Sequence, residues 1–390
     1  MNPKIAWITA GLAVLSVATT TTTALAAFDC KDGAITIGFA RAKTGGFAFF
    51  DVAGVRGFTV GVDEINAAGG IDGCKIKLIE GDTQSNPALT GQVANQLIKD
   101  GAKIIIAPSD FDAGIGASQA AQAAGVFSIS PEASSVTWTQ AVKPNHFVGG
   151  MSESDLGRDI AGFVNEKGWT GAFVVINTAY SFFTNQAKVF AQVFKGKIVG
   201  QETINEQTAD YAAVISKIRA AGDAVQVIYL DDYFPHVGTF LKQARAAGIT
   251  AAVVGNGTFS STSLQQVVGA AGLQNVFYVA SAYYEGKDID PALAKMIAAY
   301  QAKFGNFPEN TNSVVGYYAS QIIADGLRKG GSTDASALTA AIMSQKDLKL
   351  PGATYYTWND RHPTVSGTVI GFDATGEFKQ VEVLDPRNVK

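Results

Sequence analysis

The stretch DEINAAGGIDGCKIKLIEGDTQSNP, residues Asp63–Pro87, decides the fold of this chain. Its pattern predicts the end of a helix, a tight turn, a short apolar strand and the start of another helix. The paired glycines Gly69 and Gly70 supply the left-handed backbone that closes a helix, and Asn86 followed by Pro87 is typical of a helix start. A helix–strand–helix unit of this kind indicates an α/β protein with parallel strands.

Similar units recur along nearly the whole chain, because short apolar runs alternate with amphipathic stretches. The expected strands are Ile35–Ala40, Ile76–Glu80, Ile104–Ala107, Phe127–Ser130, Ala172–Ile176, Ile198–Thr203, Val225–Leu230, Ala252–Gly255 and Val276–Ala280. The expected helices include Asp51–Ala68, Ala88–Asp100, Ser152–Lys167, Tyr211–Ala221, His236–Ala247, Pro291–Phe304 and Thr311–Lys329. This alternation predicts an α/β fold with doubly wound parallel sheets.

Two breaks in the alternation, near Pro144–Gly150 and Ala280–Asp290, predict a division into two lobes. About 360 residues follow the first 26, which is too many for one hydrophobic core and suits two. We expect lobe 1 to comprise residues 27–147 and 281–355, and lobe 2 to comprise residues 148–280 and 356–390. The last segment would contain the final crossover and a hairpin around residues 373–376.

Residues 1–26 are predicted to be a signal peptide. Lys4 precedes the apolar run Ile5–Val17, and Ala24-Leu25-Ala26 matches a cleavage site. A membrane anchor is the alternative, but the apolar run has about 13 residues and a span needs about 20. A lipid anchor is disfavoured because no small residue immediately precedes Cys30. We therefore expect cleavage near Ala26 and an exported mature protein.

The net charge is −4 and the isoelectric point is about 5.5, with no basic run. This composition disfavours nucleic acid or an anionic membrane surface as a partner.

Cys30 and Cys74 are the two cysteines of the chain. Each lies just before a predicted strand, and these strands would be parallel neighbours in a doubly wound sheet. An exported protein meets oxidising conditions, so we expect a Cys30–Cys74 disulfide. Ligands bind at the opposite, carboxyl end of such strands, so the disulfide would stabilise the lobe and take no part in a binding site.

Four stretches together carry a resemblance to a known family: Ile37–Gly46 (IGFARAKTGG), Asp63–Pro87, Ile129–Ser135 (ISPEASS) and Tyr229–Gly248 (YLDDYFPHVGTFLKQARAAG). They resemble the periplasmic leucine/isoleucine/valine-type receptors, the substrate-binding proteins of ABC importers. The resemblance covers essentially the whole mature chain. It implies a monomer of two lobes joined by three crossing segments, which buries a small molecule between the lobes and delivers it to permease subunits, with no cofactor.

The resemblance also implies which residues meet the ligand. Ser134 matches the hydroxyl that binds the ligand carboxylate, with Ala133 contributing backbone; an ordinary helix cap is the alternative for Ser134. Four aromatic side chains stand at positions that line the ligand pocket in this family: Phe50, Phe111, Phe182 and Tyr233. For Phe50, packing in the hydrophobic core is the alternative.

The acid that holds the ligand ammonium in amino-acid receptors should fall near Asn256-Gly257-Thr258, and Gly257 takes its place here. Asp231, or else Asp232 or Asp112, could supply the missing negative charge. The alternative is that these three aspartates are exposed to solvent or cap helices. We therefore predict a small monocarboxylate with an apolar or aromatic body, and branched-chain or aromatic amino acids as the second choice.

Enzymatic function is disfavoured by the pattern of reactive residues. The histidines, His146, His236 and His362, lie far apart without metal-ligand spacing. Neither a nucleophile elbow nor a Walker loop is present, and Gly114-Ile115-Gly116 lacks the third glycine of a dinucleotide loop. A sensor subunit with the same fold, as in amide-sensing relatives, is a further alternative. We expect no metal and no catalysis.

Overall fold

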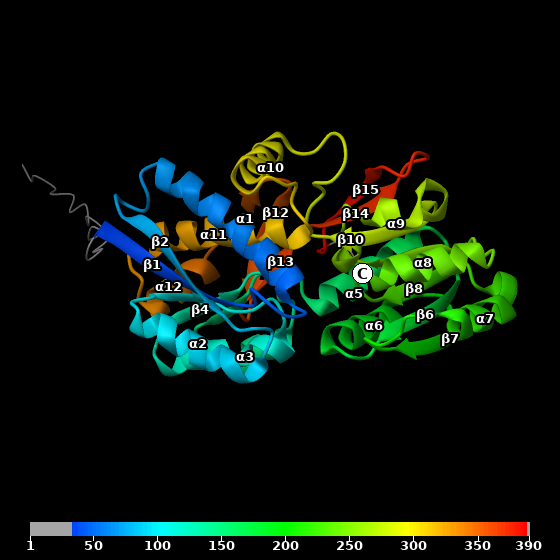
Figure 1. Cartoon of the computed structure of the whole chain (residues 1–390), viewed down its shortest axis with the longest axis horizontal. Coiled ribbons are helices and arrows are strands. Elements are labelled where there is room, and N and C mark those ends of the chain that lie inside the picture. Colours follow the sequence, from blue (N-terminus) through cyan, green and yellow to red (C-terminus); the bar gives the residue numbers. More distant parts are fainter. Residues whose placement is uncertain (1–32, 388–390) are drawn as a thin grey trace, which may run out of the picture.

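The computed structural model describes residues 33–387, which form two α/β lobes side by side (Figure 1). The chain passes between the lobes three times, at residues 149–152, at residues 281–290 and near Ser366. This arrangement confirms the predicted α/β architecture with two doubly wound lobes and a hinge of three segments.

Lobe 1 is built on a parallel sheet of β1 (Ala34–Arg41), β2 (Lys75–Asp82), β3 (Ile104–Ile106), β4 (Phe127–Ser130) and β5 (His146–Val148). The strand order is β2-β1-β3-β4-β5. Strands β3 and β4 are buried along their whole length, as expected for a parallel sheet covered by helices on both faces. In such a sheet the crevice at the carboxyl ends of the strands is the usual ligand site.

The helices of lobe 1 are α1 (Ala48–Ala67), α2 (Pro87–Lys99), α3 (Phe111–Ala123), α4 (Val136–Ala141), α10 (Pro291–Phe304), α11 (Thr311–Gly330) and α12 (Ala335–Met343). Asn86 and Asp110 cap α2 and α3 by accepting hydrogen bonds from the Ala88 and Ala113 amides.

Helices α1 and α11 lie directly against each other, and glycine makes this possible. A Cβ atom on Gly57 would lie 1.7 Å from the Ser313 carbonyl oxygen. The close packing aligns the first turns of the two helices, where Asn310 Nδ2 donates to the Phe49 carbonyl at 3.0 Å. Both first turns therefore reach the cleft together.

Lobe 2 contains β6 (Gly171–Asn177), β7 (Lys197–Ile204), β8 (Val227–Asp231), β9 (Ala252–Asn256), β10 (Val276–Ala280), β14 (Gly367–Phe372) and β15 (Phe378–Leu384). The order is β15-β14-β10-β9-β8-β6-β7. Strands β6 to β10 are parallel, whereas β14 and β15 form the predicted hairpin and are antiparallel.

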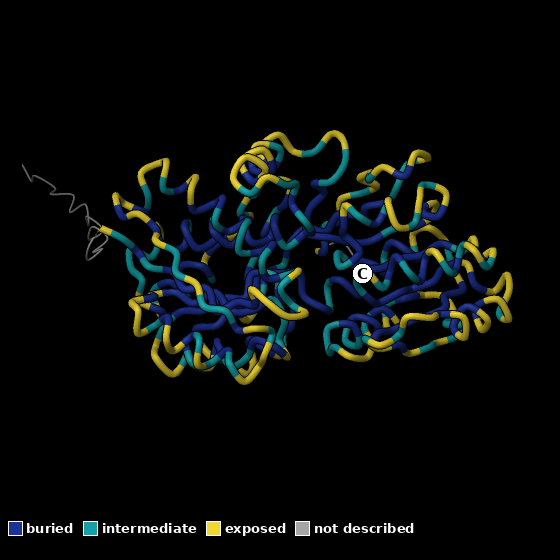
Figure 2. The backbone as a smooth tube through the Cα atoms, in the orientation of Figure 1, coloured by how far each residue is buried: buried dark blue, intermediate teal, exposed yellow. Residues whose placement is uncertain are grey.

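The helices of lobe 2 are α5 (Glu153–Glu166), α6 (Ser181–Val193), α7 (Ala212–Ala221), α8 (His236–Ala246) and α9 (Leu264–Val268), with short 3-10 turns η2 (Gly222–Ala224), η3 (Gly257–Phe259) and η4 (Ala270–Leu273). Figure 2 shows the buried backbone along both sheets and through the connection, with exposed backbone on the outer loops.

A small antiparallel sheet of β11 (Leu348–Leu350), β12 (Ala353–Asn359) and β13 (His362–Val365) was not predicted. It packs on lobe 1, since the Tyr355 hydroxyl donates to the Gly149 carbonyl at 3.0 Å and the Trp358 ring lies 5.4 Å from the Phe147 ring. The last crossing therefore lies near Ser366, inside the segment 356–390 in which a final crossover was expected. The expected break at Pro144–Gly150 also contains β5, whose three residues are too short for a clear strand pattern.

The predicted disulfide is not tested by the described residues, because Cys30 lies outside them, as does the predicted signal peptide. Cys74 is buried directly before β2, and the register pairs Ala34 of β1 with Lys75 of β2. The neighbouring strand starts agree with the geometry on which the prediction rests, and the Cys30–Cys74 pairing stays a prediction.

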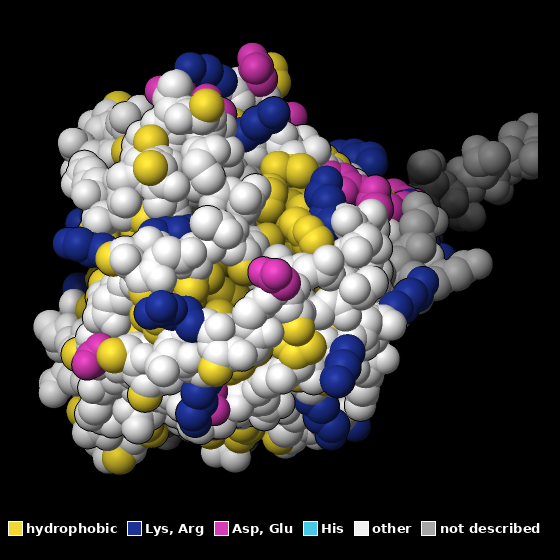
Figure 3. Space-filling model, turned by 90° about the vertical axis from the view of Figure 1, so that its right-hand side faces the viewer, with side chains coloured by type: hydrophobic (Ala, Val, Ile, Leu, Met, Phe, Trp, Pro, Cys, Tyr) yellow, Lys and Arg dark blue, Asp and Glu magenta, His cyan; other side chains and the backbone are white. Residues whose placement is uncertain are grey.

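The outer surface of the described residues exposes few large hydrophobic side chains: Phe49, Val267, Val381 and Val383. On the face shown in Figure 3, Lys and Arg side chains lie around hydrophobic surface, with Asp and Glu side chains among them. None of the helices in residues 33–387 combines the length and the apolar character that a membrane span needs.

Candidate ligand-binding site between the lobes

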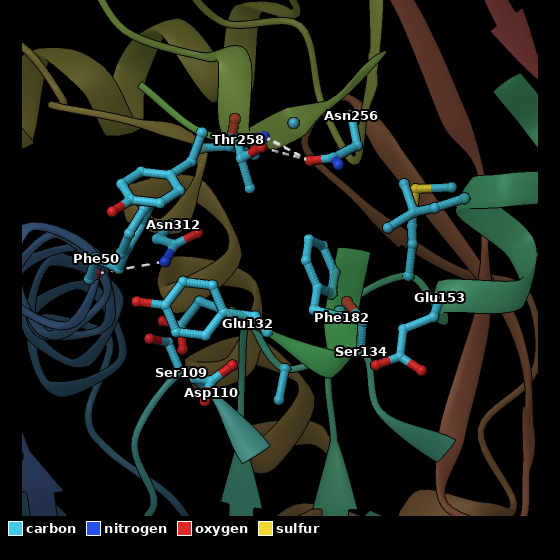
Figure 4. A pocket seen from close by; sticks show the side chains of 18 of the residues that line it. Phe50, Ser109, Asp110, Glu132, Ser134, Glu153, Phe182, Asn256, Thr258 and Asn312 are labelled. Carbon is cyan, nitrogen blue, oxygen red and sulfur yellow. Dashed lines mark hydrogen bonds between the residues drawn. The ribbon is translucent and has the colours of Figure 1, made fainter. Parts of the chain in front are cut away.

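A cavity of about 220 Å³ lies between the two lobes. Its walls come from loops that follow the carboxyl ends of strands in both sheets and from the first turn of α11. Lobe 1 contributes the loops after β1, β3 and β4, and lobe 2 contributes the loops after β6 to β10. Figure 4 shows the side chains pointing into this space from both sides.

One wall is a polar loop after β4, Ala133 to Ser135, whose residues are all buried. Among the described residues, the N–H groups of Ala133, Ser134 and Ser135 donate to no acceptor. The hydroxyls of Ser134, Ser135 and nearby Ser109 likewise form no hydrogen bond within residues 33–387, and all of these residues line the cavity. Buried N–H groups are normally satisfied, so this loop offers several donors to a molecule in the cavity.

Aromatic rings from both lobes form the opposite side of the cavity. Phe47 and Phe50 of lobe 1 meet Tyr180 and Tyr233 of lobe 2, with ring centroids 5.8 Å apart for Phe47–Tyr180 and 5.9 Å apart for Phe50–Tyr233. Tyr180 and Tyr233 are 6.3 Å apart. We name these four residues the aromatic clasp. It joins the lobes directly at one side of the cavity.

Two further rings line the cavity from opposite lobes. Phe111 lies at the start of α3 and packs edge-on against Trp138, with centroids 5.8 Å apart. Phe182 lies at the start of α6, and in Figure 4 it stands between the clasp residue Phe50 and the wall containing Ser134. Aromatic side chains from both lobes therefore line the cavity beside the polar loop.

Four carboxylic side chains also line the cavity: Asp110, Glu132, Glu153 and Glu206. The lining residues, all within the described part of the chain, include no Lys, Arg or His. Burial raises the pKa of Asp110 to about 6 and that of Glu153 to about 7. The cavity thus has a marked negative bias, which the sequence did not predict.

Within residues 33–387, Glu132 is the one cavity acid with an ion-pair partner. Arg41 at the end of β1 lies 2.8 Å from Glu132 Oε2 and 2.9 Å from Asp51 Oδ1, and all three side chains are almost fully buried. Burial raises the pKa of Glu132 although the Arg41 charge opposes this. Asp51 also accepts hydrogen bonds from the amides of Ala42 and Ser109, so the group ties β1, α1 and the cavity loops together.

The structure brings nearly all predicted site residues together. The cavity is lined by Phe50, Phe111, Ala133, Ser134, Phe182, Tyr233 and Gly257. The exception is Asp231, which is fully buried at the end of β8 and accepts hydrogen bonds from Tyr229 at 2.6 Å and Asn256 at 2.8 Å. Its carboxylate points into the lobe, and burial raises its pKa well above the usual range.

The two other aspartates considered for the missing charge also lie outside the cavity lining. Asp232 is buried and accepts from Asn177 at 2.9 Å and from Tyr211 at 3.3 Å. Asp112 is exposed and accepts from Ser181 of lobe 2 at 3.2 Å, which makes it a contact between the lobes. The position of Gly257 holds no charge, as the sequence indicated, and a Cβ atom there would meet Ala280 at an ordinary 3.4 Å.

Sequence reasoning missed Glu153 and Glu206 and the first turn of α11, which supplies Asn310, Thr311 and Asn312. Glu206 follows the predicted strand Ile198–Thr203, so the rule that sites lie at carboxyl ends of strands could have found it. The α11 residues come from a helix start that reaches the cleft only through packing on α1, and no local pattern marks them.

A model of the family described as "Periplasmic binding protein" matches residues 34–377. The chain belongs to this family. As a periplasmic binding protein it is similar to "Leu/Ile/Val-binding protein homolog 3" of Brucella melitensis, with 26% identity over 360 residues that cover 87% of this chain and 94% of the relative. The family is one of solute-binding transport proteins of the periplasm.

Solved structures of similar periplasmic binding proteins share the fold. The branched-chain amino acid transporter substrate-binding protein LivJ from Streptococcus pneumoniae, solved with isoleucine, superposes with a TM-score of 0.80 at 26% identity, covering 90% of this chain and 100% of that one. A solute-binding protein of an ABC transporter from R. palustris, solved with benzoate, has a TM-score of 0.74 at 18% identity, covering 90% and 96%.

Residues 33–387 of this periplasmic binding protein contain no group of His, Cys, Asp and Glu side chains arranged to hold a metal ion. His146 lies in β5, where its Nδ1 and the Ser128 hydroxyl are 2.9 Å apart and burial lowers its pKa to about 3. His236 lies beside Asp232, with Nδ1 3.5 Å from Oδ1. These histidines have local partners and stand outside the cavity lining.

Proposed function

We propose that this protein is the periplasmic receptor of an ABC importer that captures a small carboxylate with an apolar or aromatic body between its lobes. It delivers this solute to membrane permease subunits and catalyses no reaction. The observation that carries the proposal is the loop of unpartnered donors, Ala133 to Ser135, in the wall of an interlobe cavity lined by aromatic rings.

The donor loop suits a carboxylate because a buried charge needs several hydrogen bonds in place of water. The N–H groups of Ala133 and Ser134 and the hydroxyls of Ser134 and Ser109 supply neutral donors, which bind an anion without a buried cation. Bonds to a charged group contribute about 1.5–3 kcal/mol each. Ser134 is therefore the residue expected to contribute most to binding of the carboxylate.

The rings suit an apolar or aromatic body. Phe182 from lobe 2 and Phe111 from lobe 1 both line the cavity, and aromatic contacts are favourable in edge-on or offset geometry. Isoleucine and benzoate, present in two similar solved proteins, share a carboxylate attached to an apolar body. Their common chemistry agrees with the two kinds of wall in this cavity.

A ligand that contacts both lobes favours the closed form over the open one, because only the closed form makes both sets of contacts. The three crossing segments provide the hinge. The closed form would present the surfaces of both lobes to the permease as one binding face. We further propose that the protein acts as a monomer and that the signal peptide is removed near Ala26.

A thermal-shift screen tests the proposal, using protein that starts at residue 27 and has been unfolded and refolded to remove bound solute. The panel holds branched and aromatic amino acids, benzoate-type and phenylpropanoate-type acids, and neutral amides and sugars. A ligand at 100 times its dissociation constant adds about 2.7 kcal/mol to the stability of the native state. We expect a raised melting temperature with at least one carboxylate. Stabilisation by the amides or sugars alone would contradict the proposal.

A further inference from the structure

The charges of the cavity give information about the ligand beyond its carboxylate. Four acidic side chains and no basic one line the space, as far as the described residues show. A cavity for a simple monoanion would repel its own ligand unless these acids were neutralised.

Three of the four acids have a local explanation. Glu132 is paired with Arg41 at 2.8 Å. Asp110 caps α3 by accepting from the Ala113 amide at 3.1 Å, and burial raises its pKa to about 6. Glu153 accepts from Asn185 at 2.9 Å, and burial raises its pKa to about 7. Asp110 and Glu153 can thus hold a proton near neutral pH at little cost.

In the described part of the chain, the hydrogen-bond donors to Glu206 are all neutral. Asn177 Nδ2 donates to Glu206 Oε1 at 3.0 Å, and the Tyr233 hydroxyl donates to Oε2. Glu206 has no ion-pair partner within residues 33–387. The nearby basic side chain, His236, lies against Asp232. A carboxylate can accept about four hydrogen bonds, so Glu206 retains capacity for a further donor.

One residue of the aromatic clasp, Tyr233, contacts Glu206 directly. Tyr233 binds Glu206 through its hydroxyl and contacts Phe50 through its ring. The Tyr180 ring lies 6.3 Å from the Tyr233 ring, and burial, together with the charge of Glu206, raises the pKa of Tyr180 to about 12. Ring faces beside a carboxylate are the usual surroundings of a bound ammonium group, because ring quadrupoles and the anion both attract a cation.

We infer that the ligand carries a positively charged nitrogen in addition to its carboxylate, and that Glu206 together with the aromatic clasp binds this nitrogen. The inference rests on the proposed function, since it concerns the same cavity. Glu206 would thereby supply the negative charge that Gly257 lacks, from a loop after β7. A ligand with an amine is therefore favoured here, whereas the absence of an acid at Gly257 had favoured a ligand without one.

Calorimetric titration of the refolded protein with matched ligand pairs tests the inference. Each pair differs by one amine: L-phenylalanine and 3-phenylpropanoate, L-isoleucine and 3-methylpentanoate, 4-(aminomethyl)benzoate and 4-methylbenzoate. The first two pairs place the amine beside the carboxylate, and the third places it across the ring. We expect the amine-bearing member of at least one pair to bind about tenfold or more tightly than its partner.

The variant Glu206→Gln keeps the shape of the side chain and removes its charge. We expect it to lower affinity for the amine-bearing ligand by about tenfold or more and to change affinity for the amine-free partner by less than about threefold. Glu202→Gln is the matched control, because Glu202 lies on β7 outside the cavity and pairs with Lys217. This control should leave both affinities unchanged.

Three results would overturn the inference. Equal or tighter binding of the amine-free members would show that no cation is recognised, while the proposed capture of a carboxylate would stand. An amine preference that survives Glu206→Gln would remove Glu206 from the site. Failure of all six compounds to bind, when neutral solutes do bind, would overturn both the inference and the proposed function.

Discussion

Phe50 of lobe 1 and Tyr233 of lobe 2 meet across the cleft, with ring centroids 5.9 Å apart and ring planes 70° apart. This contact and the Ser181–Asp112 hydrogen bond join two lobes whose sheets share no strand. In the described conformation the first turn of α1 therefore reaches the loop after β8.

The contact predicts energetic coupling between the two rings. An edge-on aromatic pair contributes about 0.5–1.5 kcal/mol beyond burial. Phe50→Ala and Tyr233→Ala should each weaken ligand binding, and the double variant should lose less than the sum by about that amount. A double-mutant cycle in ligand affinity measures this. Additive losses would show that the two rings act independently. Val381→Ala is the control, since Val381 is exposed on β15 and is absent from the cavity lining.

Ser134→Ala should weaken binding of a carboxylate ligand by about 1.5–3 kcal/mol, which is tenfold or more, because a hydrogen bond to a charged group is lost. The hydroxyl has no partner among the described residues, so the free energy of unfolding should change little. Calorimetry and urea unfolding measure the two quantities separately. Thr137→Ala, on the exposed side of the next helix, should alter neither. Unchanged affinity in Ser134→Ala would remove this hydroxyl from the site.

Arg41→Met should lower the free energy of unfolding by about 3–5 kcal/mol, because it leaves the buried carboxylates of Asp51 and Glu132 without their cation. Lys43→Met serves as control, since Lys43 forms an exposed pair with Glu80 at 3.0 Å and should cost no more than about 1 kcal/mol. Urea unfolding provides both values. A loss of similar size in the two variants would mean that the buried group adds nothing beyond a surface pair.

Asp159 of α5 predicts a dependence of stability on pH. Asp159 is buried close to Gly367, the first residue of β14. Both of its carboxylate oxygens lack a hydrogen-bond partner within residues 33–387, and burial raises its pKa to about 8. The charged groups around it are Asp155 and Arg158 of the same helix and Asp385 after β15.

The folded protein therefore binds a proton at Asp159 that the unfolded chain releases at about pH 4. Protonation of Asp159 therefore stabilises the folded state relative to the unfolded state. This stabilisation is fully present below about pH 4 and is lost as the pH rises through about 8. Asp159→Asn should reduce the decline in unfolding free energy between pH 5 and 7, by at most about 1.4 kcal/mol per pH unit. Urea unfolding at several pH values measures the slope. Asp223→Asn, at an exposed site, should leave it unchanged, and an equal slope in Asp159→Asn would contradict the prediction.

The predicted disulfide gives a separate test. Non-reducing peptide mapping should recover one linked pair containing Cys30 and Cys74. Reduction should then lower the free energy of unfolding by about 4 kcal/mol, less any strain, because the crosslink restricts the unfolded chain. A variant with both cysteines replaced by serine should not respond to reductant. Recovery of both peptides unlinked would rule the disulfide out.

Local patterns predicted the fold well where each element carries its own signal. The strands β4 and β10 and the helix α10 have the predicted bounds, since buried apolar runs and a capped helix start are visible in the sequence. The three residues of β5 and the small sheet of β11 to β13 were missed. These strands exist because they pack on lobe 1, through contacts such as Tyr355 with Gly149, and not because their own pattern is distinct.

The place of the candidate cavity in the fold was predicted as far as it follows from strand ends and family resemblance, and ligand contact by its residues stays a prediction. Ser134, Phe182 and Tyr233 lie on the cavity as expected. Asp231 does not, because Tyr229 and Asn256 hold its carboxylate inside lobe 2. A sequence indicates that an acid follows a strand, but hydrogen bonds from other strands decide which way it points. Glu206 reaches the cavity through such bonds, from Asn177 and Tyr233.

A crystal structure with the tightest-binding carboxylate from the screen tests the central claim most directly. We predict the ligand carboxylate within hydrogen-bond distance of the Ser134 N–H and hydroxyl, and the ligand body in contact with Phe182 of the other lobe. A carboxylate bound away from the Ala133–Ser135 loop, or a ligand that touches one lobe alone, would contradict the account.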